Sequence, residues 1–176
     1  MAVSQVRRKC FISYHHQDER EVRQFIQDFD HMRDIFIARG IGAGMPGDVL
    51  DSNSRDYIMR RVRELYLRDS TVTIVMIGQC TWARRYVDWE IASTLRDDVR
   101  NKRSGVFGIV LPSAANAPKA PPRLEDNLAS GYAQWYHYPA SATQLSRMIE
   151  TAYSARETVK PKNDRLLFSR NRECRP

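Results

Sequence analysis

The chain has 176 residues, of which 42% are hydrophobic and 28% charged, as in ordinary soluble globular domains. This length allows one α/β domain with its own core, and the 8 glycines and 8 prolines exclude collagen-like and low-complexity classes. No apolar run approaches the roughly 20 residues that span a bilayer. Because the early basic residues Arg7 and Arg8 are followed by no apolar signal segment, we expect a cytoplasmic protein.

The net charge is +7, and it is unevenly distributed, because residues 160–176 hold +4 and the rest only +3. We therefore divide the chain into a domain at 1–158 and a basic tail at 159–176. Such a tail can bind nucleic acid, an anionic surface or a partner. Without a docking motif it is more often a solvated terminus, so nucleic-acid binding is the least favoured reading.

Cysteine and histidine spacing gives no sign of a disulfide framework or of a metal site. Cys10, Cys80 and Cys174 are far apart, with no Cys-x-x-Cys pair. We expect buried or idle thiols in a reducing compartment. The four histidines lack zinc-binding spacing, so no metal is expected.

The first half of the chain alternates short apolar runs with amphipathic stretches. Lys9 to His15 predicts a buried strand, and a helix from Asp18 follows with one apolar face. Residues 35–38 predict a second strand, and the four glycines and one proline in 39–47 indicate a mobile loop. The apolar face of the first helix consists of Val22, Phe25, Ile26 and Phe29.

A second helix is predicted from the capping residue Ser54 through Leu67. Its apolar stripe would contain Tyr57, Ile58, Val62, Leu65 and Tyr66. The arginines at 60, 61 and 63 would lie on the wetter side.

The second half continues the alternation of strands and helices. Residues 70–77 predict a central strand, a helix extends to about Asp98, and residues 106–111 and 133–138 predict two more strands. A long connection at 112–130 and a last helix at about 140–158 complete the pattern. The order predicts a doubly wound, mainly parallel five-stranded sheet with helices on both faces. Ligands then bind beyond the carboxyl ends of the strands.

One helix carries the strongest candidate site. Tyr86 and Glu90 are four residues apart and share a helix face, and Trp82 would extend that face by one turn. If Val87 and Ile91 point into the core, Glu90 lies at the edge of the apolar surface and needs a partner or a purpose. The ordinary alternative is an ion pair of Glu90 with Arg85 or Arg96.

Several segments in order resemble Toll/interleukin-receptor (TIR) domains. Residues 11–18 look like the first strand and loop of these domains, 86–90 resemble their catalytic segment, and 44–47 occupy the place of their Pro-Gly loop. Over about residues 8–157 the chain is more similar to the TIR-like ThsB subunits of Thoeris antiphage defence than to receptor TIRs. The resemblance implies a flavodoxin-like fold.

The resemblance also implies cleavage of NAD⁺ at the nicotinamide–ribose bond. NAD⁺ is then the substrate, and no cofactor is needed. Glu90 would be the catalytic carboxylate, and the product would be a cyclic ADP-ribose isomer or a related conjugate that a separate nucleotide-sensing effector detects. Self-association could complete the pocket. The matching substrate-binding positions are Ser13, Tyr14, Asn53, Trp82 and Tyr86.

Each of these residues also has a structural alternative. Ser13 could cap a turn, Asn53 could cap a helix, and Trp82 could be a packing anchor. Tyr86 could be a half-buried helix tyrosine. The whole chain could instead be a non-catalytic TIR adaptor that acts by protein–protein docking, in which case Glu90 is incidental.

Overall fold

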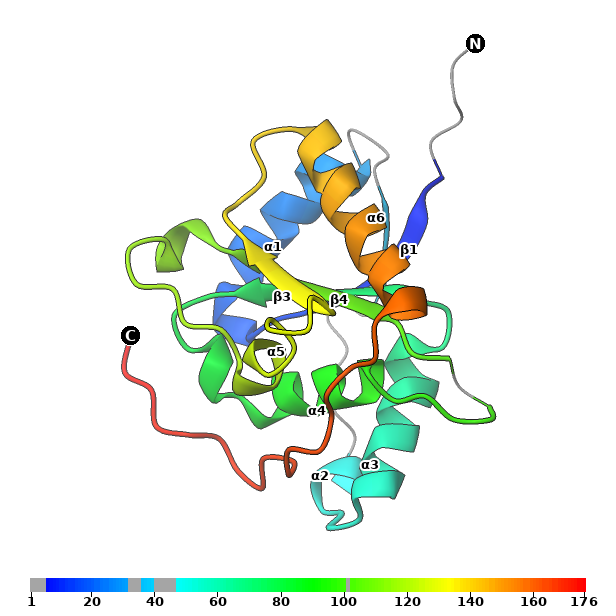
Figure 1. Ribbon diagram of the computed structural model, residues 1–176. Coiled ribbons are helices and arrows are strands. Elements are labelled where there is room, and N and C mark those ends of the chain that lie inside the picture. The colour runs from blue at the N-terminus through cyan, green and yellow to red at the C-terminus, as the bar shows by residue number, and fades with distance from the viewer. Residues whose placement is uncertain (1–5, 32–35, 40–46, 101) are drawn as a thin grey trace.

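A computed structural model describes residues 6–31, 36–39, 47–100 and 102–176 (Figure 1). At its centre is a five-stranded, wholly parallel sheet in the order β2-β1-β3-β4-β5. The strands are β1 (Arg8–Ser13), β2 (Phe36–Arg39), β3 (Val72–Ile77), β4 (Gly105–Val110) and β5 (Ala133–Tyr136). Because β1 and β3 lie side by side at the centre, their carboxyl ends meet at one edge of the sheet, as expected for a doubly wound fold.

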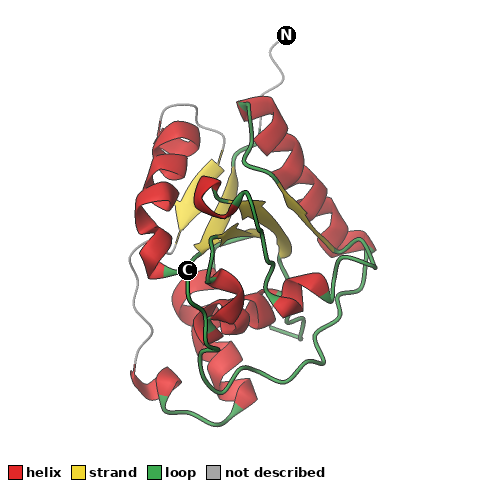
Figure 2. Ribbon diagram, turned by 90° about the vertical axis from the view of Figure 1, so that its left-hand side faces the viewer, coloured by secondary structure: helices red, strands yellow, loops and turns green. Residues whose placement is uncertain are grey.

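Helices cover both faces of this sheet (Figure 2). The short 3-10 and π-helical turns are η1 (His16–Asp18), η2 (Gln27–His31), η3 (Arg63–Leu67), η4 (Thr81–Ala83) and η5 (Pro112–Ala114). The α-helices are α1 (Glu19–Ile26), α2 (Gly47–Leu50), α3 (Arg55–Val62), α4 (Arg85–Thr94), α5 (Pro122–Glu125) and α6 (Ala142–Thr158). The predicted α/β class with a parallel sheet between helices is confirmed.

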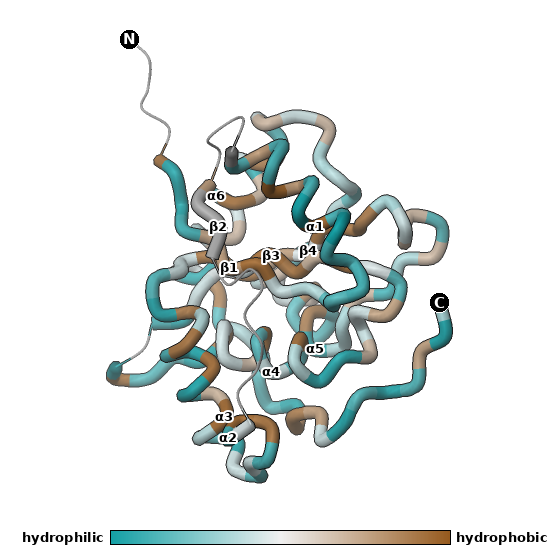
Figure 3. The backbone as a smooth tube through the Cα atoms, turned by 180° about the vertical axis from the view of Figure 1, so that it is seen from behind, coloured by the Kyte–Doolittle hydropathy of each residue, from teal (hydrophilic) through white to brown (hydrophobic). Residues whose placement is uncertain are grey.

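The central strands are buried on both faces because every residue of β3 and β4 is inaccessible to solvent. One face packs against α1 and α6, with Ile12 and Ile74 of the sheet in contact with the predicted apolar face of α1. The opposite face packs against α2 to α5. The hydropathy of the chain follows this layering, with apolar strands at the centre and polar segments outside (Figure 3).

The prediction of the second helix is correct for its first residue and wrong for its last turn. Ser54 caps α3 by accepting a hydrogen bond from the Tyr57 amide. From Arg63 the helix widens into the π-helical turn η3, which changes the face on which the following side chains lie. Arg63 is consequently buried and Leu65 exposed, the reverse of the expectation from regular helical spacing.

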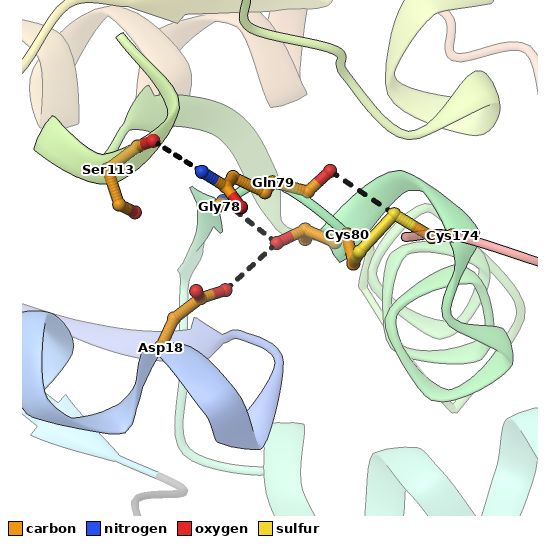
Figure 4. The surroundings of a disulfide bond; sticks show 7 residues. Asp18, Gly78, Gln79, Cys80, Ser113 and Cys174 are labelled. Atoms are coloured by element: carbon orange, nitrogen blue, oxygen red, sulfur yellow. Dashed lines mark hydrogen bonds between the residues drawn. A yellow bond between two sulfur atoms is a disulfide. The ribbon is translucent and has the colours of Figure 1, made fainter. Parts of the chain in front are cut away.

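The cysteine prediction is wrong for two of the three residues. Cys80 and Cys174 form a disulfide between the start of η4 and the end of the chain (Figure 4). Cys10 is buried and free, as expected. Because two of the three cysteines are paired, the number of cysteines no longer argues for a reducing compartment.

The tail at 159–176 packs along the α4 and α5 side of the domain, which differs from the expected solvated terminus. Phe168 is buried, and its carbonyl accepts a hydrogen bond from the Trp89 indole nitrogen at 2.9 Å. The Arg172 amide donates to the Ala83 carbonyl at 2.8 Å. The tail therefore contacts the same helix that carries Tyr86 and Glu90.

A buried ion pair holds this junction together. Arg123 of α5, fully buried, donates from Nε and Nη2 to the two carboxylate oxygens of Asp88 at 2.8 and 3.2 Å. The Phe168 amide donates to the same carboxylate at 2.9 Å. Such a pair is retained only when its remaining donors are satisfied, and here Arg123 also donates to tail carbonyls at Arg165 and Leu166.

None of the helices in the described ranges is both long enough and apolar enough to cross a membrane.

Candidate active site

The candidate site forms where β1 ends. Side chains alternate along this strand, so Ile12 packs on the α1 and α6 face and Phe11 packs on the opposite face with α3 and α4. Ser13 follows the same alternation as Phe11. The last residue of β1 therefore presents a hydroxyl to α4.

Glu90 on α4 receives that hydroxyl. Ser13 Oγ donates to Glu90 Oε2 over 2.5 Å. The position of Glu90 results from the burial of its helix, because Val87 and Ile91 pack into the sheet, as the sequence predicted. The carboxylate is left half-buried at the rim of this packing.

The environment of Glu90 opposes its negative charge. Burial raises the pKa of Glu90 to about 8, although the hydrogen bond from Ser13 acts in the opposite direction. No lysine or arginine in the described part of the chain forms an ion pair with it. Glu90 is thus a carboxyl group with one neutral hydrogen-bond donor and no countercharge.

The two arginines that could have neutralised Glu90 lie elsewhere. Arg96 pairs with Asp98 at 2.9 Å and lies near Asp56. The Arg85 guanidinium lies over the rings of Tyr86 and Trp89, at 5.2 and 5.3 Å from their centroids. The ordinary interpretation of Glu90 as a surface ion-pair partner is therefore wrong.

Two tyrosines flank this carboxyl group. Tyr86 lies one turn before Glu90 and packs against Trp89, with ring centroids 6.0 Å apart. Tyr66, from η3, packs near Phe11 with centroids 6.3 Å apart. Burial raises the pKa of Tyr66, and the charge of Glu90 raises it further, which places the phenol in the electrostatic field of the carboxylate.

Tyr66 is a candidate site residue that the sequence did not reveal. It was expected only as part of the apolar stripe of the second helix. The π-helical turn determines where it lies, and no spacing rule for a regular helix predicts such a turn. Tyr66 lies near Glu90 only because η3 packs against α4, and these two helices are distant in sequence.

Trp82 does not extend the face of Tyr86 and Glu90. Arg84 has an extended backbone, with φ −97° and ψ 124°, so a break separates η4 from α4. Instead, the Trp82 ring lies under the ammonium group of Lys119, which is 3.4 Å from the ring centroid. The expectation of one continuous helix face through Trp82 is wrong.

Tyr14 and Asn53 are also placed apart from the Ser13–Glu90 pair. Tyr14 packs against the hydrophobic cluster on the α1 and α6 face. Asn53 is exposed in the turn before α3. Its neighbour Arg55 donates to the Asn163 carbonyl of the tail, so this arginine serves to hold the tail.

The loops after β1 and β3 meet beside the site. Thr81 Oγ1 accepts the Gly78 amide at 2.9 Å and donates to Asp18 at 3.4 Å (Figure 4). A side chain at Gly78 would overlap the Asp18 carboxylate, so only glycine allows this approach. His15 is 5% exposed, and burial, followed by the charges of Arg84 and His16, lowers its pKa to about 4.

The remaining candidate segment, the Gly/Pro loop at 42–47, lies outside the described residues except for Gly47, at the start of α2.

The parallel sheet, with residues 11–18 at the end of β1 and residues 86–90 on α4, has the arrangement expected of a TIR-like domain. Residues 11–116 match the family described as the Thoeris protein ThsB, TIR-like domain, and the chain belongs to this family. A comparison with curated proteins found no match.

Proposed function

We propose that this chain cleaves the nicotinamide–ribose bond of NAD⁺ and that Glu90 is the catalytic carboxylate. The single observation that carries the proposal is the half-buried Glu90 carboxyl group, which accepts a hydrogen bond from Ser13 and forms no ion pair with any described residue. Membership of the ThsB TIR-like family supports the same activity. The chemistry of the reaction explains why such a group is useful.

Cleavage breaks the bond between the anomeric carbon of the ribose and the nicotinamide nitrogen. The electron pair leaves with nicotinamide, which becomes neutral, and positive charge develops on the ribose. A carboxylate beside this sugar stabilises the transition state more than the ground state only if water and other cations do not already neutralise it. In the described part of the chain no lysine or arginine forms an ion pair with Glu90, which supports the proposal on the side of the cations.

The positive charge of NAD⁺ explains how Glu90 can ionise despite its raised pKa. In the free protein the carboxyl group holds its proton up to about pH 8. The positive nicotinamide ring next to it favours the ionised form and lowers its pKa. Substrate binding and ionisation of Glu90 are therefore coupled in this proposal.

The other side chains take supporting roles in the proposal. Tyr86 packs against the cationic nicotinamide or the ribose, because an aromatic face attracts a cation. Ser13 is a positioning residue for the carboxylate. Tyr14, Asn53 and Trp82 would contact only the parts of NAD⁺ that extend beyond the reacting ribose.

The fate of the ribose cation determines the product. Attack by an atom of the same molecule gives a cyclic ADP-ribose isomer, and attack by water gives ADP-ribose. We propose a cyclic or related ADP-ribose signal that a separate nucleotide-sensing effector detects in antiphage defence. Completion of the site by a second copy of the chain would favour the internal attack over water.

The test is incubation of the purified full chain with NAD⁺ at increasing protein concentration. Chromatography follows released nicotinamide, and mass spectrometry of the second product separates a cyclic isomer from ADP-ribose. The proposal expects nicotinamide and one of these products in equal amounts. A chain that releases no nicotinamide at any concentration, also after exposure to phage-infected cell extract, contradicts the proposal and favours a docking adaptor.

A further inference from the structure

A polar pocket lies at the amino ends of β3 and β4, at the opposite ends of the strands from Ser13 and Glu90. It has a volume of about 650 Å³ and is lined by Arg63, Glu64, Arg68, Ser70, Thr71, Arg100, Lys102 and Arg156. Its walls come from the end of η3, the residues before β3, the segment before β4 and the end of α6. In Figure 1 these segments lie on the right-hand side of the view. The length of a six-residue strand, about 20 Å, separates this edge from Ser13.

The charge of this pocket is strongly one-sided. Five of its lining residues are cationic and one, Glu64, is acidic. Glu64 already pairs with Arg61, and Lys102 pairs with Glu157 at 2.9 Å. In the described part of the chain, Arg63, Arg68 and Arg100 form no ion pair.

Arg63 is the most unusual of these cations, because it is only 8% exposed. Its guanidinium donates to two backbone carbonyls, those of Ser93 at 3.1 Å and of Lys102, which fix its position without neutralising its charge. Asp98 and Asp97, whose charges act on Arg63, form their ion pairs with Arg96 and Arg103. A buried cation that forms no ion pair of its own is costly, and an anion that reaches it lowers this cost.

A second, independent observation points to a ligand. Ser70 lines the pocket, is 7% exposed, and its Oγ has no hydrogen-bond partner among the described residues. The hydroxyl of the neighbouring Thr71 is likewise buried and unpartnered. Buried hydroxyls are nearly always hydrogen-bonded, and both can donate to an anionic oxygen.

We propose that this pocket binds a phosphate-bearing small molecule, with a diphosphate group as its minimal recognised unit. Guanidinium groups bind phosphate oxygens through paired hydrogen bonds, and the two hydroxyls would supply further donors. The volume falls within the range of small-molecule sites. Because Arg63 and Ser70 lie nine-tenths buried inside the pocket, a compact ligand reaches them better than the backbone of a nucleic acid does.

The test is calorimetric titration of the full chain with inorganic pyrophosphate, ADP and adenosine in low-salt buffer. Pyrophosphate and ADP should bind, and adenosine should not. Tighter binding of ADP than of pyrophosphate would assign the source as a nucleotide, and equal binding would assign a free inorganic anion. No pyrophosphate binding overturns the proposal, as does tighter binding of a single-stranded oligonucleotide than of either small anion.

Substitutions localise the binding. Arg68→Gln and Arg100→Gln remove exposed charges and should each weaken pyrophosphate binding about tenfold. Arg20→Gln, which removes an exposed charge from α1, is the matched control and should leave affinity unchanged. Equal weakening by all three would show nonspecific attraction and overturn the proposal.

Ser70→Ala separates binding from folding. The ligand-free variant should melt at the same temperature as the wild type or higher, because an unpartnered buried hydroxyl does not stabilise the fold. Pyrophosphate affinity should nevertheless fall at least threefold, on the order of one hydrogen bond. A lowered melting temperature with unchanged affinity would contradict a role of this hydroxyl in binding.

Discussion

At the scale of single residues, Glu90 is stabilised in its neutral form in the folded chain. The unfolded chain releases this proton near the ordinary pKa of 4.5, whereas the folded chain keeps it up to about 8. Between these values the folded state binds more protons, so the contribution of Glu90 to the free energy of unfolding falls as the pH rises.

Glu90→Gln should abolish the fall in stability with rising pH, because glutamine does not ionise. It keeps the shape of the side chain and can still accept the hydrogen bond from Ser13. Near pH 5 the variant and the wild type should melt together. At pH 8.5 the variant should melt about 3 °C or more above the wild type. Thermal melts over pH 5–9 check this, and parallel curves for the two proteins would show that Glu90 ionises freely.

Ser13 favours the ionised form of Glu90, because its hydrogen bond lowers the pKa that burial raises. Ser13→Ala should therefore move the ascending limb of the pH profile of kcat/KM to higher pH. Activity at pH 7 should fall about tenfold and recover in part at pH 9. A uniform loss at every pH would instead assign Ser13 to substrate contact.

At the scale of elements, α4 connects the sheet, α5 and the tail. Its inner side buries Val87 and Ile91 against the sheet, while Asp88 and Trp89 bind α5 and the tail. The orientation of the helix is therefore fixed from two sides, and Glu90 is held at the rim where both contacts meet. Preorganisation of this kind is what an electrostatic catalytic group requires.

Arg123→Met tests the contact of α4 with α5 and the tail, because it leaves Asp88 buried without its cation. The free energy of unfolding should fall by about 3–5 kcal/mol. Adding Asp88→Leu removes the uncompensated charge, and the double variant should regain part of this loss. Urea denaturation measures the free energy of unfolding of each variant. The assignment is contradicted if the double variant loses more of this free energy than the two single variants lose together.

At the scale of the whole molecule, the sequence predicted the layers better than the connections between them. Apolar runs identified the strands, and the spacing along α1 and α4 identified their buried sides, because burial depends on local periodicity. The rule that sites form at the carboxyl ends of parallel strands selected the segments that contain Ser13 and Glu90, whereas the hydrogen bond between them was not predicted. The α/β fold was therefore predictable, and the place of Glu90 on the helix after the central strand was as well.

The contacts made by the tail and the position of Tyr66 were not predictable by the same reasoning. Phe168 and Asp88 are 80 residues apart, and no local pattern records their hydrogen bond. Spacing excluded Cys-x-x-Cys motifs but carries no information about a pairing across 94 residues. The π-helical turn, which moves Arg63 inside, depends on packing and not on the propensities of its residues.

Cys174→Ser tests the connection of the tail at this scale. Loss of the cross-link should lower the free energy of unfolding by about 2–4 kcal/mol and leave the last residues open to proteolysis. The wild type treated with reductant should match the variant. Identical melting of wild type and variant in the absence of reductant would show that the two cysteines are not joined in solution.

The central claim concerns one carboxyl group, and a comparison of initial rates tests it most directly. Nicotinamide release from NAD⁺ is measured for the wild type, Glu90→Gln and Glu125→Gln, the last being an exposed glutamate on α5. The account predicts wild-type rates for Glu125→Gln and a loss of at least about 100-fold for Glu90→Gln. A Glu90→Gln protein that is folded and releases nicotinamide at the wild-type rate would contradict it.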